Sequence, residues 1–550
     1  AGRHQLAPDL DRGARPRGLG PAPTVSPMRV AIVGNGPVGQ SAALLLARWG
    51  VPTVLLDRRP RRDPVGSKAI CQHRDVLDIW EAVGAGGQVA AEGVTWTTAR
   101  TYYRVKELFA ITLRDPGRSP FPPFVNISQS RTEEVLDERI AAQPLIDVRW
   151  GYEVAGIGQD ATGVTLRCVT AAGAETVTAD YAVLCAGASC HDLRETVGVR
   201  FDGHSFADKF LICDIRAELP GWESERRFYF DPEWNPGRQV LIHPCPGGTY
   251  RIDWQVPPNF DLEAEERGGG LDRRIRQIIG DRPYEVVWRS VYRFHARCAD
   301  RMRVGRVLLA GDAAHLMAPF GARGLNSGVQ DAENAAWKLA FVLRGWAPET
   351  LLDTYHDERL AAAKENLDVT SATMRFLVPH SDAEWAYRLS VLEQALHDPA
   401  ARGRVDSGRL AEPFWYVDSP LTTRNPTRAF RTRPPRGELP PPVPGVLVPD
   451  VPVRMPGSER VSRLREIVRD GFLVLLAPGA DAAVDGVTQA PVRILRMTEI
   501  DPGGALVDTL RARTGEAWLV RPDGHVAAVV PVSEPGALTA ALARALCLPP

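Results

Sequence analysis

The sequence has 550 residues, of which 44% are hydrophobic and 24% charged, and its formal net charge is −1. This composition is typical of a globular protein with several domains, and it excludes the strongly basic surface that binds nucleic acids or anionic lipids. Apolar runs such as 42–47 and 472–477 are far shorter than the ~20 residues that cross a bilayer. The eight cysteines show neither CxxC spacing nor the density of a disulfide scaffold. We therefore expect a cytoplasmic protein with no membrane partner, no nucleic-acid partner and no metal site.

Residues 1–27 are rich in glycine, proline and arginine and have no apolar periodicity. We interpret them as a flexible tail, because the apolar core of a secretory signal is missing and Asp9 and Asp11 are untypical of a transit peptide. An ordered fold is predicted from residue 28 onwards. Arg29–Val33 and Val51–Leu56 are strand candidates and Gln40–Trp49 is a helix candidate, which predicts an α/β sheet covered by helices.

The turn between the first strand and the helix has the GxGxxG spacing. Gly34 allows a tight turn, Gly36 lets the backbone approach a pyrophosphate, and Gly39 lets the helix pack closely on the strand. Asp57, after the second strand, is placed to accept hydrogen bonds from a ribose. We predict a dinucleotide site; the alternative is a structural glycine turn, and this motif does not separate NAD from FAD. The candidate residues are Gly34, Gly36, Pro37, Val38, Gly39, Asp57 and Arg58.

The pattern along the chain then changes from helical to strand-rich. Residues 73–100 and 124–142 contain helical stretches, and short β-rich segments follow between residues 152 and 256. These segments predict a mixed or antiparallel sheet in a middle domain. From Leu325 to Leu343 an apolar face recurs at steps of three and four residues, which predicts a long helix.

A second glycine-rich constellation precedes that helix, in Gly311-Asp312-Ala313-Ala314-His315, Pro319-Phe320-Gly321 and Gly324-Leu325-Asn326-Ser327-Gly328. Asp312 follows an apolar strand candidate, where a carboxylate can bind ribityl hydroxyls. The helix start near Gly324 offers amides and the positive end of a dipole to the N1/O2 edge of a flavin. This constellation selects FAD; the alternative makes Asp312 a helix cap and the glycines a loop.

Eight prolines lie between Arg433 and Arg454 and predict a domain linker. Beyond it, strand candidates at Gly471–Leu476, Val492–Arg496 and Ala517–Val520 predict a small separate α/β domain.

With its two glycine motifs and the strand-rich segment between them, the chain resembles the FAD-dependent aromatic hydroxylases of the p-hydroxybenzoate hydroxylase type over most of residues 28–370. It is most similar to the subgroup of 3-(3-hydroxyphenyl)propionate hydroxylase, phenol hydroxylase and the polyketide hydroxylases, which carry a C-terminal thioredoxin-like domain. Gly471-Phe472-Leu473 and Val520-Arg521-Pro522-Asp523-Gly524-His525-Val526 resemble signatures of that domain. The resemblance implies an α/β fold with a Rossmann-like FAD-binding domain, a β-sheet substrate domain and a thioredoxin-like domain.

The resemblance also implies a division of the chain into domains. It implies an FAD-binding domain at 28–198 and 288–370, a middle β-sheet substrate domain at 199–287, a helical connector at 371–432, the proline-rich linker at 433–454 and the thioredoxin-like domain at 455–550. The last domain has no CxxC pair, so we expect no dithiol chemistry.

Further site residues are implied by the resemblance alone. Gln129 would contact the flavin pyrophosphate or ribityl chain, and Lys68 stands where the family usually has an arginine, unless it is an ordinary surface lysine. Pro319 would act through its backbone carbonyl and its shape beside the flavin. The chain departs from the family at Ala186, where an acid is usual in a motif associated with NAD(P)H. The implied cofactor residues are Lys68, Gln129, Gly311, Asp312, Pro319, Gly324, Leu325 and Asn326.

The implied reaction is the hydroxylation of a phenolic or polycyclic aromatic substrate. NAD(P)H would visit transiently to reduce the flavin, O2 would add at its C4a atom, and the hydroperoxide would transfer one oxygen to the ring. The substrate would lie between the flavin and the middle sheet. There, His243 could orient or deprotonate a phenol, or be hydrogen-bonded scaffold. Aromatic residues of this sheet could be core or ligand wall: Phe228, Tyr229, Phe230, Trp234, Tyr250 and Trp254.

Other functions share parts of this pattern. A flavin dehydrogenase or reductase would have both motifs but would transfer no oxygen, and a flavin-binding scaffold would not turn over at all. A flavin halogenase would need a Gly-Trp-x-Trp-x-Ile run, which is absent. The sequence is compatible with a homo-oligomer and does not identify the aromatic ring.

Overall fold

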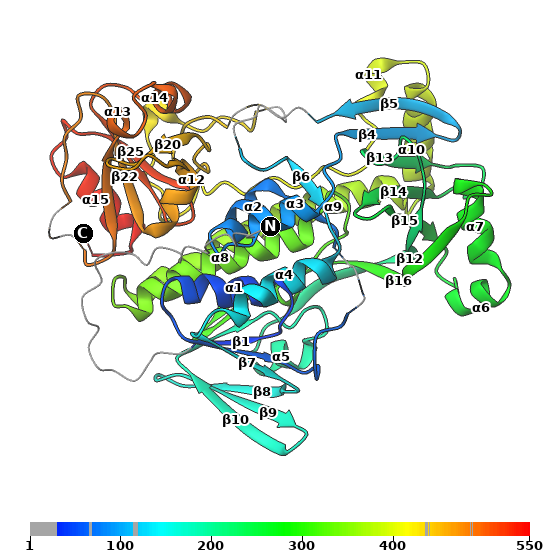
Figure 1. The fold of residues 1–550 in the computed structure, drawn as a ribbon, viewed down its shortest axis with the longest axis horizontal. Helices are drawn as coiled ribbons and strands as arrows, with labels where there is room; N and C mark the ends of the chain where they lie inside the picture. The colour runs from blue at the N-terminus through cyan, green and yellow to red at the C-terminus, as the bar shows by residue number, and fades with distance from the viewer. Residues whose placement is uncertain are drawn as a thin grey trace, which may run out of the picture.

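The computed structural model describes residues 30–64, 66, 69–113, 119–434, 438, 440–484, 486 and 488–549 (Figure 1). The tail predicted for residues 1–27 and the candidate Lys68 lie outside these ranges. Among the helices of the described ranges, none combines the length and apolar character needed to cross a bilayer.

A six-stranded sheet occupies the centre of the fold. Its strands are β1 (Val30–Val33), β2 (Thr53–Asp57), β7 (Ile146–Trp150), β11 (Tyr181–Leu184), β17 (Arg303–Val304) and β18 (Val307–Leu309), in the order β17-β18-β11-β1-β2-β7. All neighbours except β17 pair in parallel. The inner strands are short apolar runs, buried along their whole length, as expected for parallel strands covered on both sides.

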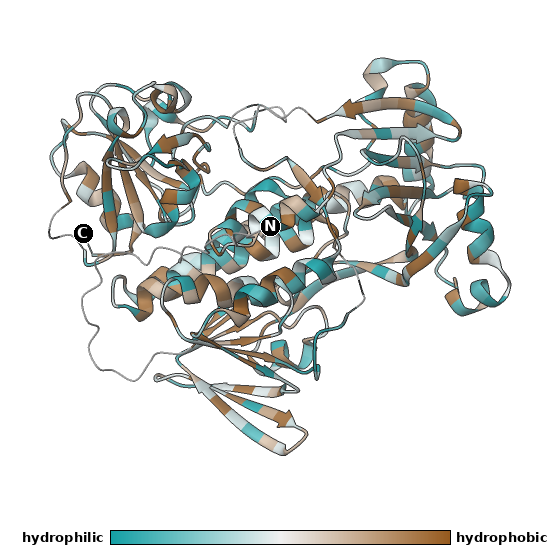
Figure 2. Cartoon of the chain, in the orientation of Figure 1, coloured by the Kyte–Doolittle hydropathy of each residue, from teal (hydrophilic) through white to brown (hydrophobic). Residues whose placement is uncertain are grey.

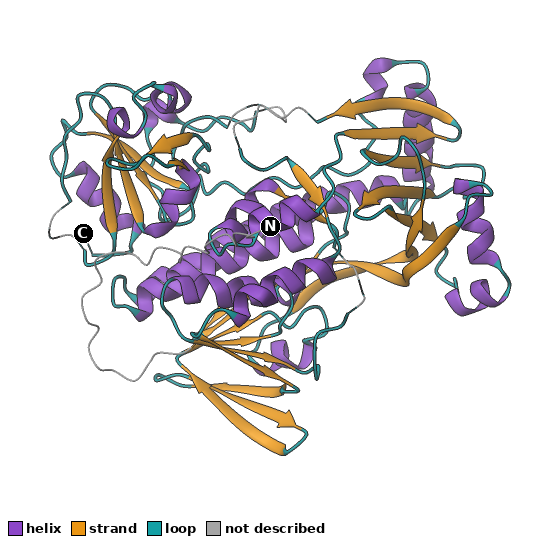
Figure 3. Cartoon of the chain, viewed as in Figure 1, coloured by secondary structure: helices purple, strands orange, loops and turns teal. Residues whose placement is uncertain are grey.

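Helices cover one side of this sheet, and a second small sheet lies on the other (Figures 1 and 3). The helices of this layer are α1 (Pro37–Arg48), α2 (Arg74–Glu81), α3 (Gly86–Glu92), α4 (Gln129–Ala141) and α8 (Arg323–Leu343). The small sheet consists of β8 (Glu153–Gln159), β9 (Val164–Thr170) and β10 (Gly173–Ala179). Figure 2 shows apolar residues along the central strands, whereas polar and apolar residues mix in β8–β10. The predicted first strand, first helix and second strand are confirmed as β1, α1 and β2.

The middle sheet has eight strands in the order β19-β16-β12-β15-β14-β13-β4-β5. They are β4 (Thr98–Tyr103), β5 (Lys106–Thr112), β12 (Phe201–Ala217), β13 (Glu225–Phe230), β14 (Gln239–Cys245), β15 (Thr249–Val256), β16 (Tyr284–Ala299) and β19 (His315–Leu316). The mixed sheet expected from the strand-rich segment 152–256 contains only its later part, β12–β15. The expectation was wrong for the earlier part, because β8–β10 form a small sheet of their own and β11 joins the parallel sheet. The eight-stranded sheet extends beyond residues 199–287 at both ends, because β4 and β5 join its edge and β16 continues to Ala299.

Several short elements connect these layers. A two-stranded ribbon pairs β3 (Cys71–His73) with β6 (Phe124–Asn126), and α5 (His191–Thr196) follows β11. Helices α6 (Leu262–Arg267) and α7 (Gly270–Ile279) lie between β15 and β16 in the chain, and α9 (Asp353–Leu377), α10 (Asp382–Ala395) and α11 (Pro399–Arg402) follow α8. The connector predicted to be helical over 371–432 is α-helical only as far as Arg402.

The C-terminal domain is built on a four-stranded, thioredoxin-like mixed sheet in the order β23-β22-β24-β25. Its strands are β22 (Phe472–Leu476), β23 (Val492–Arg496), β24 (Glu516–Val520) and β25 (Val526–Pro531), and a ribbon of β20 (Pro452–Arg454) and β21 (Val461–Arg463) precedes them. Its helices are α12 (Leu464–Ile467), α13 (Met497–Ile500), α14 (Ala505–Leu510) and α15 (Ala537–Ala545). The proline-rich segment is not a free linker, because the Val446 carbonyl accepts the Val526 amide and the Val448 amide donates to Gly524.

Candidate functional site

The first glycine turn joins β1 to α1 at the carboxyl edge of the six-stranded sheet. Gly34 has a φ of +108°, and a Cβ there would overlap the carbonyl oxygen of Cys185. A Cβ on Gly39 would overlap the carbonyl oxygen of Gly34, so both positions require glycine. Gly36 differs, because a Cβ there meets no atom within 4 Å. This open space, before a helix start that no side chain caps, fits a pyrophosphate.

Asp57 ends β2 beside this turn, and neighbouring donors hold its carboxylate in place. It accepts hydrogen bonds from the Asn35 amide at 2.8 Å and from Nε of Arg59 at 3.0 Å. Burial alone would raise the pKa of Asp57, but these hydrogen bonds outweigh burial and lower it. The side chain is therefore a carboxylate, which can accept further hydrogen bonds from a ribose. Arg58 is exposed, and it is its neighbour Arg59 that contacts Asp57.

The second glycine constellation lies at the same sheet edge and interlocks with the first. Gly311 follows β18 with a φ of +62°, and its amide donates to Asp331 at 2.9 Å. A Cβ on Gly311 would lie 3.0 Å from Cγ2 of Val38, and one on Gly328 would lie 2.6 Å from the same atom. Val38 of α1 therefore packs against Gly328 of α8 and against the turn at Gly311. Asp312 is exposed although its chain neighbours are buried, so its side chain lies at the surface of this edge.

Helix α8 begins at Arg323, next to the start predicted near Gly324. Its N-cap residue, Ala322, has a φ of +56° and makes no side-chain cap, and a Cβ on Gly324 would meet no atom within 4 Å. The first turn of α8 can thus present its amides to the anionic edge of a ligand. Leu325 is half-buried in this turn. Pro319 is exposed, and its carbonyl oxygen accepts the Ala322 amide at 2.9 Å.

Asn326 is buried and joins the ribbon β3 to α8. Its Oδ1 accepts the His73 amide at 2.8 Å, and its Nδ2 donates to the carbonyls of Cys71 at 3.0 Å and Ala322 at 2.6 Å. Because these contacts occupy the side chain, a cofactor contact by Asn326 would use its backbone amide.

Gln129 is the first residue of α4, and its chain neighbours Ser128 and Ser130 line a cavity. Its Oε1 accepts the Ala69 amide at 3.2 Å, and its Nε2 donates to Glu133 at 2.9 Å. The cavity has a volume of about 280 Å³ and separates the start of α4 from the eight-stranded sheet. Its walls include Ile127, Ser128 and Arg131 on one side and Asp214, Cys245 and Trp288 on the other.

The two faces of the eight-stranded sheet pack differently. Phe228 and Phe230 belong to a buried cluster with Phe320, which follows Pro319, and the rings of Phe228 and Phe320 lie 6.4 Å apart. This is the face on the side of the second glycine constellation. Four other aromatic residues pack as core with α7 on the opposite face: Tyr229, Trp234, Tyr250 and Trp254.

His243 lies on the same face as Phe228, because side chains alternate along a strand. Its Nε2 lies 3.9 Å from Oδ2 of Asp253, and its Nδ1 is buried without a hydrogen-bond partner in the described part of the chain. Burial, assisted by Arg226 and Arg251, holds the pKa of His243 well below its ordinary value. Burial also raises the pKa of Asp253 to about 7. His243 is therefore neutral and retains the capacity for one more hydrogen bond.

Arg194, eight residues after Ala186, is buried and linked to the second glycine turn. Its guanidinium donates to the carbonyls of Ala188 and Ala313, each at 3.1 Å. The Arg194 side chain therefore ties the segment that follows Ala186 to Ala313, the residue after Asp312.

Sequence reasoning missed two arginines close to Asp57. Arg59 and Arg62 both donate to the carbonyl of Asn35, and their guanidinium groups lie 5.7 Å and 5.1 Å from the ring centre of Trp150. The run of arginines after Asp57 signals positive charge here, but it does not show which members turn toward the glycine turn.

Two glycine turns that interlock at one edge of a parallel sheet, with a cavity against a second sheet, are the arrangement expected of a dinucleotide-binding flavoprotein. Residues 27–370 match the family described as FAD binding domain, and residues 441–549 match the aromatic-ring hydroxylase C-terminal domain. The chain therefore belongs to this family of FAD-binding proteins. It binds FAD and is a flavin-dependent monooxygenase that hydroxylates aromatic rings.

Relatives of this chain support the assignment. A flavin-dependent monooxygenase from Mycobacteroides abscessus is 32% identical over 62% of this chain and 74% of its own length. A 3-(3-hydroxy-phenyl)propionate/3-hydroxycinnamic acid hydroxylase from Comamonas testosteroni is 30% identical, over 66% of this chain and 61% of its own length. The 6-methylpretetramide 4-monooxygenase of Streptomyces rimosus is 29% identical over 95% of this chain and 94% of its own length.

Solved structures show the same architecture. Anhydrotetracycline hydroxylase from Streptomyces rimosus has a TM-score of 0.69 and 27% identity, and the match covers 95% of this chain and 100% of that one. Aklavinone-11 hydroxylase, solved with FAD and aklavinone, has a TM-score of 0.76 at 24% identity, over 94% and 99% of the two chains. The latter likeness concerns the fold alone.

Proposed function

We propose that this protein uses NAD(P)H and O2 to hydroxylate a phenolic ring of a polycyclic aromatic substrate. The observation that carries the proposal is the cavity of about 280 Å³ between the start of α4 and the eight-stranded sheet. Ser128 and Ser130, the chain neighbours of Gln129, line it on one side, and Asp214, Thr249 and Trp288 of the sheet line it on the other. Its walls combine apolar residues such as Ile127 and Trp288 with polar ones such as Arg131 and Asp214, and its volume is close to the lower end of the ~300–1,000 Å³ found for sites of small organic ligands.

The relatives favour a polycyclic substrate over a single ring. The matches to 6-methylpretetramide 4-monooxygenase and anhydrotetracycline hydroxylase each extend over 95% of this chain. The match to the hydroxyphenylpropionate hydroxylase of Comamonas testosteroni covers 66%. The C-terminal domain and the middle sheet are thus both shared with enzymes named for polycyclic substrates.

Bound FAD supplies the redox chemistry, in which electrons from NAD(P)H activate O2. The protein chain binds the cofactor and orients the substrate. In this proposal the open starts of α1 and α8 bind the anionic parts of the cofactor, and Asp57 and Asp312 accept hydrogen bonds from its hydroxyls. Phe320, beside Pro319, packs against Phe228 on the face of the sheet that also lines the cavity, and it would help to exclude water from the reacting ring.

His243 is the proposed hydrogen-bond acceptor for the phenol. A neutral imidazole with a free ring nitrogen can accept a phenolic proton and so increase the phenolate character of the ring. Asp253, 3.9 Å from Nε2 of His243, stabilises the imidazolium that would form. These roles rest on the geometry of the two side chains and on their place on the cofactor-facing side of the sheet.

The test is NAD(P)H oxidation by the purified, FAD-loaded protein against a panel of phenols. The panel contains a single-ring phenol, 3-(3-hydroxyphenyl)propionate and hydroxylated three-ring and four-ring aromatics, and each product is weighed by mass spectrometry. We expect a polycyclic phenol to stimulate oxidation and to gain one oxygen atom. Stimulation by single-ring phenols alone would refute the polycyclic class, and oxidation with no oxygenated product would favour a flavin reductase.

His243→Gln is the variant that tests the proton acceptor, with the exposed His191→Gln as its control. Loss of a general base costs about 100-fold to 10,000-fold in turnover. We expect a loss of this order in His243→Gln at neutral pH, with FAD affinity unchanged, and partial recovery at high pH, where phenols ionise without help. A variant with wild-type turnover at neutral pH would remove His243 from the mechanism.

A further inference from the structure

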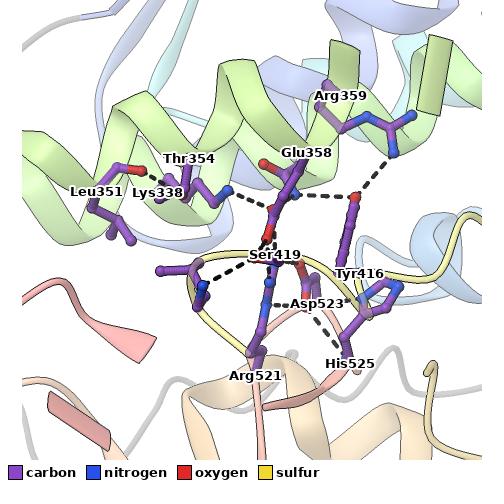
Figure 4. A network of polar contacts seen from close by, with 12 residues as sticks. Lys338, Leu351, Thr354, Glu358, Arg359, Tyr416, Ser419, Arg521, Asp523 and His525 are labelled. Carbon is purple, nitrogen blue, oxygen red and sulfur yellow. Dashed lines mark hydrogen bonds and ion pairs between the residues drawn. The ribbon is translucent and has the colours of Figure 1, made fainter. Parts of the chain in front are cut away.

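A buried network of polar side chains joins the C-terminal domain to the long helices of the FAD-binding domain (Figure 4). Its C-terminal part is the hairpin turn between β24 and β25, which we call the 521–525 turn. Arg521, Asp523 and His525 in this turn have exposed fractions of 0%, 2% and 7%. Charged groups are rarely buried to this extent unless they are paired, so the position of each partner is tightly constrained.

Arg521 is the centre of the contact. Its two terminal nitrogens donate to both carboxylate oxygens of Glu358 on α9, at 2.5 Å and 2.9 Å. The same guanidinium donates to Asp523 at 2.6 Å and 3.1 Å, and this ion pair holds the turn in shape. Glu358 also accepts Nζ of Lys338 on α8 at 2.6 Å. The 521–525 turn therefore engages α8 and α9 together through one carboxylate.

The network continues from Glu358 to the second glycine turn. Arg359, the chain neighbour of Glu358, donates to Asp331 at 2.5 Å. Asp331 in turn accepts the amide of Gly311 at 2.9 Å. Tyr416 connects the two halves, because its hydroxyl accepts Nδ2 of Asn334 at 3.2 Å and a guanidinium nitrogen of Arg359 at 2.9 Å. Asn334 in turn donates to Glu358 at 2.8 Å. An unbroken set of buried hydrogen bonds thus leads from the C-terminal domain to the turn that carries Asp312.

A second route leads from the same domain to the start of α8. Arg465 on α12 forms ion pairs with Asp75 and Asp78 on α2, the latter at 2.9 Å. Asp75 lies 2.8 Å from Nδ1 of His73, whose amide donates to Asn326 in the first turn of α8. The C-terminal domain is therefore connected to the Gly311 turn by the first route and to the first turn of α8 by the second, in each case through residues in direct contact.

We propose that the 521–525 turn is a positioning element for FAD: through Glu358, Arg359 and Asp331 it fixes the Gly311 turn in the conformation that binds the cofactor. This inference rests on the proposed placement of FAD at Gly311 and Asp312. A buried ion-pair network specifies geometry more than it adds stability, since apolar residues of the same volume can stabilise a core at least as well. The C-terminal domain, which has no CxxC pair, thereby acquires a role in cofactor binding without any chemistry of its own.

The test compares two buried arginines in the full-length protein. Arg521→Met removes the charge that faces Glu358. Arg428→Met is the matched control, because Arg428 is also buried and forms a two-point ion pair with Glu516, at 2.8 Å and 3.0 Å, within the C-terminal region. Its other hydrogen bonds go to the carbonyls of Arg511 and Pro442, so it does not reach α8 or α9. FAD affinity is measured by titration of the protein freed of cofactor, and thermal unfolding is measured with and without FAD.

We expect the Kd for FAD to rise about tenfold in Arg521→Met and to change less than about twofold in Arg428→Met, because residues that couple two sites typically change the binding of a ligand by this order. The rise in melting temperature on adding FAD is expected to shrink in the first variant only. Arg521→Lys should recover part of the affinity, since it keeps the charge but loses the two-point contact. The absorption spectrum of bound flavin should shift in Arg521→Met and return in Arg521→Lys.

Equal loss of FAD affinity in both variants, or loss of stability in Arg521→Met with unchanged FAD affinity, would overturn the proposal. If Arg521→Met does not fold, Tyr416→Phe provides the same comparison, because it removes one hydroxyl from the middle of the network and leaves the ring in place. FAD titration needs no substrate. A protein that binds FAD in this way but hydroxylates no phenol would therefore disprove the proposed function and leave this inference standing.

Discussion

The three glycines of the first turn are required for different reasons. Gly34 and Gly39 are restricted by the chain itself, because a Cβ at either position would overlap a carbonyl oxygen. Gly36 has free space around it, so the chain does not restrict this position, and the proposed pyrophosphate would be what requires glycine there. An alanine scan of this turn can therefore separate folding from cofactor binding.

We expect Gly36→Ala to leave the stability of the cofactor-free protein within about 1 kcal/mol of wild type while FAD affinity falls at least tenfold. Gly39→Ala should lower both, since the backbone must move to admit the methyl group. The measurements are urea unfolding without FAD and FAD titration. Wild-type FAD affinity in Gly36→Ala would place the pyrophosphate elsewhere.

The buried carboxyl group of Asp253 makes the stability of the protein depend on pH. Its pKa is raised by burial from the ordinary 3.8 to about 7, so the folded protein binds this proton more tightly than the unfolded chain does. Stability therefore falls as pH rises between these two values, and the full cost is present above about pH 7. Asp253→Asn lacks this cost. Its melting temperature relative to wild type should be higher at about pH 8 than at about pH 5; a pH-independent difference would contradict the raised pKa.

At the scale of elements, the site depends on the approach of α1 to α8. Val38 lies between Gly311 and Gly328, and a Cβ on Gly328 would stand 2.6 Å from Cγ2 of Val38 and 3.1 Å from the Gly311 Cα. The distance between the two helices is therefore set by the absence of side chains at two glycines. Any group added at Gly328 would therefore push α8 away from Val38 and so separate the two segments at which we propose that FAD binds.

Gly328→Ala is expected to destabilise the protein by about 1–3 kcal/mol through overpacking and to weaken FAD binding. Adding Val38→Ala to this variant should restore part of the stability and part of the FAD affinity, because it removes the methyl group nearest to the new Cβ. Denaturant unfolding and FAD titration of the two single variants and the double variant measure this coupling. Additive losses would show that Val38 is not the residue that clashes.

The sequence predicted those parts of the site that depend on local signals. The spacing of glycines placed Gly34–Gly39 and Gly311–Gly328 at strand-to-helix turns, and periodicity predicted α8 to within two residues of its start. What it could not predict depends on contacts between distant segments. Nothing local distinguishes Arg59 from Arg58, since the choice depends on how the chain turns after β2. The partners of Arg521 likewise lie on α9, far away in the sequence.

At the scale of the whole molecule, the C-terminal domain shares its core with the FAD-binding domain. Trp337 and Phe341 on α8 belong to the same buried cluster as Phe472 on β22, and the ring centres of Phe341 and Phe472 lie 5.9 Å apart. The proline-rich segment before the domain is also packed rather than free. A shared apolar core and a buried polar network make independent unfolding of the two domains costly.

We therefore expect the cofactor-free protein to unfold in a single calorimetric transition, although its length would allow separate domains to melt separately. Phe472→Ala tests this because the ring lies on the C-terminal side of the shared cluster. Removing a buried phenylalanine costs about 3–5 kcal/mol, and this loss should lower the temperature of the whole transition. Two resolved transitions, of which the variant lowers only one, would show that the C-terminal domain is an independent folding unit. In that case the contacts of Arg521 could not hold the Gly311 turn while the C-terminal domain is unfolded, and FAD affinity in Phe472→Ala would fall at temperatures between the two transitions.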